Sequence, residues 1–306
     1  MRRAIAVAVL SALAGCGGAA PSGSPAFATQ AVRARVIRPD FPTSSSLIFE
    51  ADAQEAQVNI YHTFELASNP PPIATIAVAH GCPYALAMDK AGTLYVADNC
   101  GGNDVEEYPR GETALKKSIT RGISNPLGIA VDSHFRLYVS NGPATITEYA
   151  NGATKPSRTI SGAPLVSPTG LAVDKNANLY IADPGAGVVF KVPSKGSGVT
   201  ALALQGLEQP VNVAVDLRTN YLWVTDAAAD RIDVYKLGST SPALEISGAG
   251  SPYAVGVENK GKPKGEMVES DLTTHGVYAF EPSKSVPYAI LSNGIEDPMG
   301  LLIQNP

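Results

Sequence analysis

The chain has 306 residues, of which 44% are hydrophobic and 17% charged, and its 29 glycines and 24 prolines indicate frequent turns. This length and composition suit one large all-β domain or two ordinary domains with a globular core. The formal net charge of −5 argues against partners that need a basic surface, namely nucleic acids and anionic membrane surfaces.

The first residues predict export. The basic "MRR" precedes the apolar run "AIAVAVLSALAG", which is too short to span a bilayer. This run leads into Leu13-Ala14-Gly15-Cys16, which resembles a bacterial lipobox. The resemblance implies cleavage before Cys16 and diacylation of its thiol, the alternative being an ordinary signal peptide that happens to contain Cys16. Cleavage would leave 21 basic residues against 28 acidic ones.

Three regions follow from this interpretation. Residues 1–15 are expected to be a lipoprotein signal peptide, and residues 16–45, rich in Gly, Ala, Ser and Pro, a flexible tether. Residues 46–306 are expected to form the folded domain. The predicted location is the cell envelope, with the lipid anchor in the outer membrane or in the outer leaflet of the cytoplasmic membrane.

A repeat of about 42 residues organises the folded domain. "PTGLAVDKNANLYIAD" from Pro168 returns as "PYALAMDKAGTLYVAD" from Pro83, "PLGIAVDSHFRLYVSN" from Pro126 and "PVNVAVDLRTNYLWVTD" from Pro210, and in a more divergent form from Pro252. Each unit holds four short apolar or alternating runs separated by turn residues, which is typical of consecutive antiparallel strands. Four strands in a unit of this length predict a propeller blade.

The motif resembles NHL repeats, whose pattern is Pro-x-Gly-Ile-Ala-Val-Asp, a turn, and Ile-Tyr-Val-Ala-Asp. The resemblance implies a six-bladed β-propeller of four-stranded antiparallel blades. Five units are complete, the segment from Ser46 to Val78 lacks a first strand, and "DPMGLLIQNP" at the end of the chain supplies one. We therefore expect Leu301, Leu302 and Ile303 to pair with Leu47, Ile48 and Phe49 and to close the first blade.

Asp174 and Asp183, nine residues apart, could be an acid–base pair, a metal clamp or turn residues. Their counterparts recur in nearly every unit, whereas a catalytic pair is normally made once. We therefore predict that they bind backbone N–H groups of the adjoining turns. An aromatic residue also recurs in the third strands, as Tyr108, Tyr149, Phe190, Tyr235 and Phe280.

The distant resemblance to gluconolactonase-like and streptogramin-lyase-like propellers implies a site at the central mouth, on the face that we call the top. There, the first family holds a divalent cation with Glu, Asn and Asp, and the second uses His. The residues after the repeat prolines are instead Tyr84, Leu127, Thr169, Val211, Tyr253 and Met299, with Asn212 one place further. This set departs from both patterns, because a metal needs several converging ligands.

Charge is distributed unevenly between the two faces. The top loops are expected to carry the acidic residues Asp52, Glu55, Asp98, Asp104, Asp183, Glu208, Asp226, Asp230, Asp271, Glu296 and Asp297. The opposite face, which we call the bottom, is expected to gather the basic residues Lys90, Arg110, Arg136, Lys155, Lys175, Lys195, Arg218 and Lys284. Two interpretations fit this distribution. The charges are either an ordinary solvated surface, or the acidic top is a binding face for a cationic or metal-bridged partner.

These observations favour a lipid-anchored binding or interaction scaffold, without catalytic residues and without a cofactor or bound metal. The alternative is a lactonase- or lyase-type enzyme with Ca²⁺ or another divalent cation at the mouth. Its partner is expected to be a protein, glycan or small molecule, with no nucleic acid and with membrane contact through the anchor alone. The expected binding residues are Tyr84, Asp98, Asp104, Thr169, Asp183, Asn212, Asp226, Asp230, Tyr253 and Asp271.

A disulfide is predicted between Cys82 and Cys100. With Cys16 lipidated, these two cysteines remain in an oxidising compartment. Cys82 immediately precedes a predicted inner strand, and Cys100 lies two residues after the end of the antiparallel neighbour, so both reach the top face. A metal site is the alternative, but with only His80 close in sequence it is one ligand short of a tetrahedral set.

Overall fold

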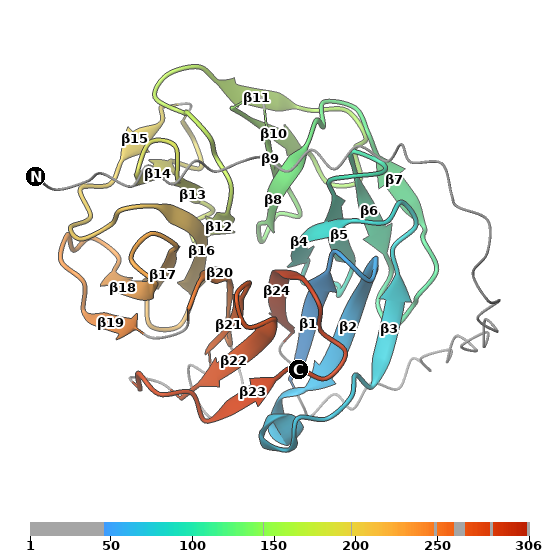
Figure 1. Ribbon diagram of the computed structural model, residues 1–306. Helices are drawn as coiled ribbons and strands as arrows, with labels where there is room; N and C mark the ends of the chain where they lie inside the picture. Colours follow the sequence, from blue (N-terminus) through green and yellow to red (C-terminus); the bar gives the residue numbers. More distant parts are fainter. Residues whose placement is uncertain are drawn as a thin grey trace, which may run out of the picture. The chain divides into compact units, whose positions relative to one another are not determined.

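The computed structural model describes residues 46–142, 144–196, 198–247, 250–259, 267–281 and 284–304, with only the backbone of residues 64 and 65. The predicted signal peptide, Cys16 and the tether lie outside these residues. The described chain forms six four-stranded antiparallel sheets arranged as blades around a central axis (Figure 1). This confirms the predicted all-β, six-bladed propeller.

The strands take the same four positions in each blade, numbered 1 to 6 in chain order. The inner strands are β24 (Pro298–Gln304), β4 (Pro83–Met88), β8 (Pro126–Val131), β12 (Leu171–Val173), β16 (Pro210–Asp216) and β20 (Pro252–Val257). The second strands are β1 (Leu47–Asp52), β5 (Leu94–Asp98), β9 (Leu137–Asn141), β13 (Leu179–Asp183), β17 (Tyr221–Asp226) and β21 (Met267–Asp271).

The third strands are β2 (Gln57–His62), β6 (Asp104–Tyr108), β10 (Thr145–Tyr149), β14 (Val188–Val192), β18 (Arg231–Lys236) and β22 (Gly276–Phe280). The outer strands are β3 (Ala74–Ala77), β7 (Lys117–Ile119), β11 (Arg158–Ser161), β15 (Thr200–Ala201), β19 (Leu244–Ser247) and β23 (Ala289–Leu291). A 3₁₀ helix, η1 (Thr63–Ser68), follows β2. Among the described residues, no helix has the length and apolar character needed to cross a membrane.

Blade 1 is closed by strands from both ends of the described chain. Strand β24 pairs antiparallel with β1, placing Ile303 opposite Ile48 and Leu302 opposite Phe49. The two half-blades thus complete one sheet, β24-β1-β2-β3, as predicted. The pairing covers the edge that β1 would otherwise leave open, and β24 becomes the inner strand of the blade.

The hydrophobic core lies between neighbouring blades. Ile48 and Tyr61 of blade 1, for example, pack with Val268 and Ala279 of blade 6. Large rings fill the same place on the third strand of five blades, as Tyr61, Tyr108, Tyr149, Tyr235 and Phe280, each no more than 2% exposed. In blade 4 the aromatic residue, Phe190, lies two places earlier in the register, at the same place as Glu106 in blade 2.

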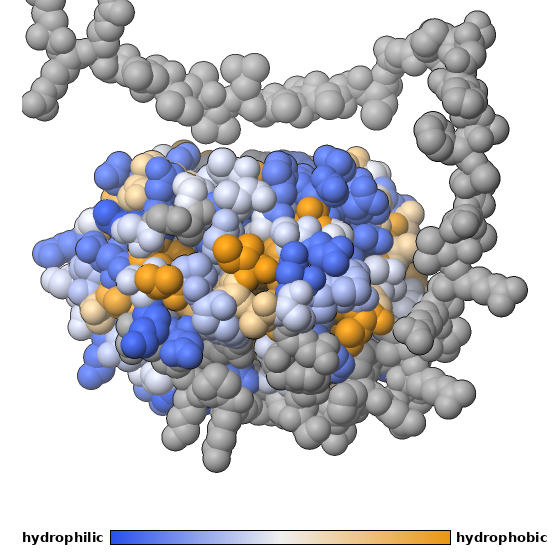
Figure 2. All heavy atoms as spheres, turned by 60° about the horizontal axis from the view of Figure 1, so that its bottom comes forward, coloured by the Kyte–Doolittle hydropathy of each residue, from blue (hydrophilic) through white to orange (hydrophobic). Residues whose placement is uncertain are grey.

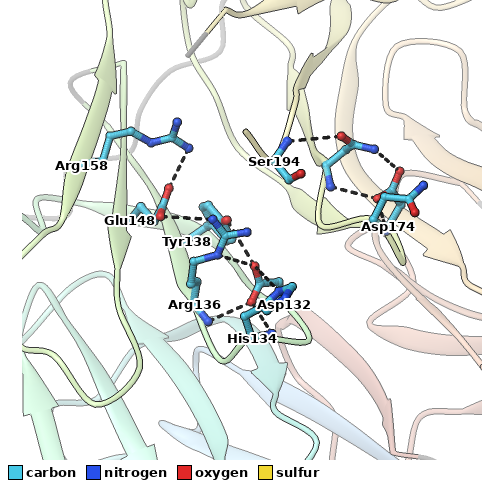
Figure 3. A network of polar contacts seen from close by, with 10 residues as sticks. Asp132, His134, Arg136, Tyr138, Glu148, Arg158, Asp174 and Ser194 are labelled. Atoms are coloured by element: carbon cyan, nitrogen blue, oxygen red, sulfur yellow. Dashed lines mark hydrogen bonds and ion pairs between the residues drawn. The ribbon is translucent and has the colours of Figure 1, made fainter. Parts of the chain in front are cut away.

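The aspartates that follow the inner strands are turn residues, as predicted. The Asp174 carboxylate accepts hydrogen bonds from the N–H groups of Asn176 and Asn178 at 2.8 and 2.9 Å, and from the Asn178 side chain at 2.7 Å. Asp132 binds its own turn in the same way and also accepts a hydrogen bond from Arg136 Nε at 2.7 Å (Figure 3). Because antiparallel strands alternate in direction, these turns lie on the bottom face.

Candidate functional site

The residues that end the second strands fix the loops of the top face. Asp52, Asp98, Asp183, Asp226 and Asp271 are all 0% exposed. In blade 4, the Asp183 carboxylate accepts hydrogen bonds from the N–H groups of Val166 and Ser167 at 2.8 Å and of Ala186 at 3.0 Å. It therefore ties the loop that enters the blade to the turn that leaves its second strand.

Four of these aspartates were expected to bind a partner. Like Asp183, the carboxylates of Asp98, Asp226 and Asp271 accept hydrogen bonds from backbone N–H groups of the loops around them. Buried and occupied in this way, the four side chains position the top loops and do not offer free carboxylates at the surface.

Exposed acidic side chains stand on the loops that these aspartates hold. Glu55, Glu208 and Glu296 are exposed, and so is Asp230. The N–H groups of Glu55 and Glu296 donate to the two carboxylate oxygens of Asp52 at 2.9 and 2.7 Å, and the Glu208 N–H donates to Asp226 at 2.7 Å. Three exposed negative charges are thus attached to backbone that is itself anchored to the blades.

The mouth residues form a separate group around the top ends of the inner strands. The rings of Tyr84 and Tyr253 meet edge to face, with centroids 6.0 Å apart and an interplanar angle of 86°. Burial raises the pKa of both phenols, so both hydroxyls remain protonated. The Thr169 hydroxyl donates to the Val211 carbonyl at 2.7 Å, and Asn212 Oδ1 accepts from the Val213 N–H at 2.8 Å. The polar groups of Thr169 and Asn212 are therefore engaged by backbone.

A central cavity of about 520 Å³ runs along the inner strands to the turns of the bottom face. Its wall includes Asn212 but not Tyr84, Thr169 or Tyr253. At the bottom it is lined by Asp89, Asp132 and Asp174, whose carboxylates bind their own turns, and by the exposed cations Lys90, Arg110 and Lys175. Sequence reasoning placed these cations on the bottom face but gave no signal for a cavity, because its walls are ordinary inner-strand residues.

The predicted disulfide is present. Cys82 and Cys100 are joined, with their Cα atoms 5.3 Å apart. Cys82 precedes β4 and Cys100 follows β5, whose ends pair through Pro83 and Asp98. The Cys82 N–H also donates to the Asp98 carboxylate at 3.2 Å, so the bridge and this hydrogen bond hold the same corner of blade 2.

One group among the described residues has the composition of a metal site. His80, Asp98, Asp104 and Glu106 place potential ligand atoms within 4.8 Å of one another. Asp98 and Asp104 were expected at the top face, whereas His80 and Glu106 were not included in the predicted site. The missed signal is the spacing of Asp104 and Glu106, since residues two apart in a strand share one face of the sheet.

The visible surface is mainly polar. Figure 2, which brings the lower part of Figure 1 forward, shows small, separate hydrophobic groups among hydrophilic residues. On the outer side of blade 6, Val286 and Ile290 are exposed by 73% and 46%. Tyr288, between them, is 41% exposed, and small exposed apolar groups of this kind are normal on folded domains.

No protein-family model matches this chain, and no curated protein matches it. Among solved structures, it is similar to a chain in the crystal structure of a nidogen/laminin complex, with a TM-score of 0.70 and 18% sequence identity. The match covers 84% of this chain and 98% of that one. At this level of identity, the similarity shows the propeller fold alone.

Proposed function

We propose that this protein is an exported, lipid-anchored binding scaffold built from NHL-type repeats, and that it engages a cationic partner through its top face. Cys16 is the proposed lipid attachment site, and residues 16–45 the tether between the membrane and the propeller. The proposed location is the cell envelope. The propeller of the nidogen/laminin complex comes from a structure of two interacting proteins, which supports an interaction role for this fold.

The observation that carries the proposal is the anchoring of exposed glutamates by buried aspartates. Asp52 holds the backbone N–H groups of both Glu55 and Glu296, and Asp226 holds that of Glu208. Binding is weakened when loops must be ordered at the moment of association. Loops that are already fixed avoid most of that cost, and their negative charges attract a cationic partner.

Titration with a fluorescent deca-lysine peptide tests this surface directly. Wild-type protein is expected to bind it at low ionic strength and to lose affinity as salt rises, because the Debye length falls from about 30 Å at 0.01 M to about 10 Å at 0.1 M. The variant E55Q/E208Q/E296Q is expected to bind at least about threefold more weakly, since exposed charge pairs contribute about 0.2–1 kcal/mol each.

A matched control removes the same number of charges elsewhere. Glu112, Glu245 and Glu281 are exposed and none of them lies in a top loop, although Glu245 Oε1 is 4.0 Å from Arg231 Nε, next to the loop that carries Asp230. The variant E112Q/E245Q/E281Q has the same net charge as the top-face variant and is expected to retain most of the affinity. Equal losses in the two variants would show that net charge, rather than the top face, attracts the peptide, and would refute the proposed surface.

A further inference from the structure

Three carboxylates and an imidazole converge at the top of blade 2, beside the disulfide. His80 Nδ1 lies 2.9 Å from Glu106 Oε1 and 3.3 Å from Asp104 Oδ2. Asp98, at the end of β5, brings its carboxylate into the same group. His80 comes from the connection between β3 and β4, so the cluster joins the entrance of blade 2 to its third strand.

Two of the carboxylates are buried, and one of them has an oxygen that accepts no hydrogen bond. Asp104 and Glu106 are 1% and 0% exposed; Asp104 Oδ1 has no hydrogen-bond donor, whereas Glu106 Oε1 is in contact with the His80 imidazole at 2.9 Å. Their other oxygens are occupied: the Ser118 hydroxyl donates to Asp104 Oδ2, and the Ala79 N–H and Tyr108 hydroxyl donate to Glu106 Oε2. A buried carboxylate with an unsatisfied oxygen is costly unless a cation compensates it.

Blade 5 shows how the negative charge of a buried carboxylate at the same position is balanced elsewhere in the protein. Asp104 and Arg231 are both the first residue of a third strand, each opposite the aspartate that ends the second strand. Glu106 and Asp233 follow two places later, and Arg231 Nε lies 2.9 Å from Asp233 Oδ1. Blade 5 thus carries its own cation, whereas blade 2 has a second carboxylate in place of the arginine.

We infer that His80, Asp104 and Glu106 bind a zinc-class divalent metal ion, with Asp98 as the fourth ligand. The Asp98 oxygens also accept backbone N–H groups, but each carboxylate oxygen has a second lone pair for a metal. A tetrahedral Zn²⁺ with bonds of about 2.0–2.1 Å places its ligand atoms about 3.3–3.4 Å apart. The 3.3 Å separation of His80 Nδ1 from Asp104 Oδ2 matches that value, and the 2.9 Å separation from Glu106 Oε1 is shorter. An imidazole ligand favours Zn²⁺ over Ca²⁺, which prefers oxygen alone.

The environment of the cluster fits this assignment. A Cβ atom on Gly102 would lie 2.6 Å from Asp104 Oδ1 and 2.8 Å from His80 Nδ1. Glycine therefore lets the β5–β6 loop lie against the two ligands without a side chain between them.

The metal would act as a second cross-link beside the Cys82–Cys100 bridge. It would fasten the β3–β4 connection, through His80, to β6, through Asp104 and Glu106. This inference does not depend on the proposed partner surface, because its ligands are distinct from Glu55, Glu208 and Glu296.

Calorimetric titration of the full chain with ZnCl₂ tests the site. Reductant-free buffer keeps the disulfide intact, so that the thiols of Cys82 and Cys100 do not compete for the metal. Wild type is expected to bind one equivalent of Zn²⁺, and to bind Ca²⁺ at least about 100-fold more weakly. H80Q and D104N are each expected to lose at least about 100-fold in Zn²⁺ affinity, because each removes a direct ligand.

Two control variants resemble these changes but leave the cluster intact. His134 is an exposed histidine on the bottom face, with Nδ1 3.9 Å from Asp132 Oδ2, and Glu107 follows Glu106 in β6 but pairs with Lys117 at 2.9 Å. H134Q and E107Q are expected to bind Zn²⁺ as wild type does. Absence of stoichiometric binding in wild type, undiminished binding in both H80Q and D104N, or equal affinity for Ca²⁺ would overturn the inference.

A measurement on wild type alone covers the case in which a variant fails to fold. Diethylpyrocarbonate modifies accessible histidines, and the side chains of His80 and His134 are 43% and 72% exposed. Mass spectrometry of peptides is expected to show that one equivalent of Zn²⁺ protects His80 and leaves His134 reactive. Equal modification of His80 with and without Zn²⁺ would mean that the imidazole forms only an ion pair with the carboxylates, and would also overturn the inference.

Discussion

Ile303 lies directly opposite Ile48, so the last described strand of the propeller pairs with the first. Both side chains are buried, at 5% and 0% exposure, and both belong to the core between blades 6 and 1. The ring is therefore held closed by strand pairing and by a shared hydrophobic cluster. The contacts between β1 and β24 join the two ends of the described chain, and the stability of the whole ring depends on them.

Deleting residues 297–306 is expected to destabilise the propeller strongly. The deletion removes β24, including the buried Met299, Leu301 and Ile303, each worth about 1.5–3 kcal/mol, and exposes β1 as an edge. The milder change I303A is expected to cost about 2–5 kcal/mol in the free energy of unfolding measured with denaturant. V286A, at a position 73% exposed, is the control and should change it by less than about 0.5 kcal/mol. Unchanged stability in the truncation would contradict the closure.

Removing the disulfide is expected to destabilise blade 2 without changing the fold. The bridge closes a loop of sequence separation 18, for which the chain-entropy model gives about 3 kcal/mol. C82S/C100S should therefore unfold at lower denaturant concentration than wild type, with a similar far-UV circular dichroism spectrum. Intact mass before and after thiol alkylation checks the bridge itself: two alkylated thiols in unreduced, exported protein would count against it.

The fold could be predicted from the sequence because the same pattern of strand and turn residues recurs in several repeats. The five complete copies repeat a proline at or shortly before the start of the inner strand and an acidic residue at the turn that follows it. The bonds of Asp174 show why, because the turn needs a carboxylate. The disulfide followed from strand direction together with the two cysteines that remain when Cys16 is lipidated. Turn hydrogen bonds and strand directions can be predicted from one sequence because they involve residues of a single blade.

The candidate site was only partly predictable, because exposure and convergence depend on the whole ring. Asp183 and Glu208 look alike as top-loop acids, yet Asp183 is 0% exposed and Glu208 is exposed. Likewise, the approach of His80 to Glu106, which are 26 residues apart, depends on the path of the β3–β4 connection. The central cavity has no sequence signal, since it is a space left by six strands.

Lipidation remains a prediction, since Cys16 lies outside the described residues. C16A is expected to accumulate as unprocessed precursor, because the cysteine thiol is the proposed site of diacylation. Wild type should carry the mass of a diacylated N-terminal cysteine and require detergent for release from membranes. A C16A protein that is processed and fractionates like wild type would show that the leader is an ordinary signal peptide.

Glu269 is a buried carboxyl group at a position where blades 2 to 5 have a branched apolar residue and blade 1 has the buried Glu50. It lies two residues before the end of the second strand of blade 6, and Val96, Val139, Ile181 and Val224 occupy this position in blades 2 to 5. The side chain is 0% exposed, and neither carboxyl oxygen has a hydrogen-bond partner. Burial, and then the charge of Asp271, raises the pKa of Glu269 to about 9.

This carboxyl group should make stability depend on pH, and E269V should remove its contribution. Because the folded-state pKa lies above the ordinary value of 4.5, the folded state holds the proton more tightly, and that stabilisation is lost as pH rises from 4.5 towards about 9. The free energy of unfolding of E269V minus that of wild type should grow by up to about 1.4 kcal/mol per pH unit across this window. Denaturant titrations at pH values between about 5 and 8 measure this difference in the free energy of unfolding.

E281Q, which changes an exposed glutamate of the same blade, is the control, and its stability should follow that of wild type at each pH. A difference between E269V and wild type that stays constant with pH would mean that Glu269 is ionised in the folded protein throughout this range.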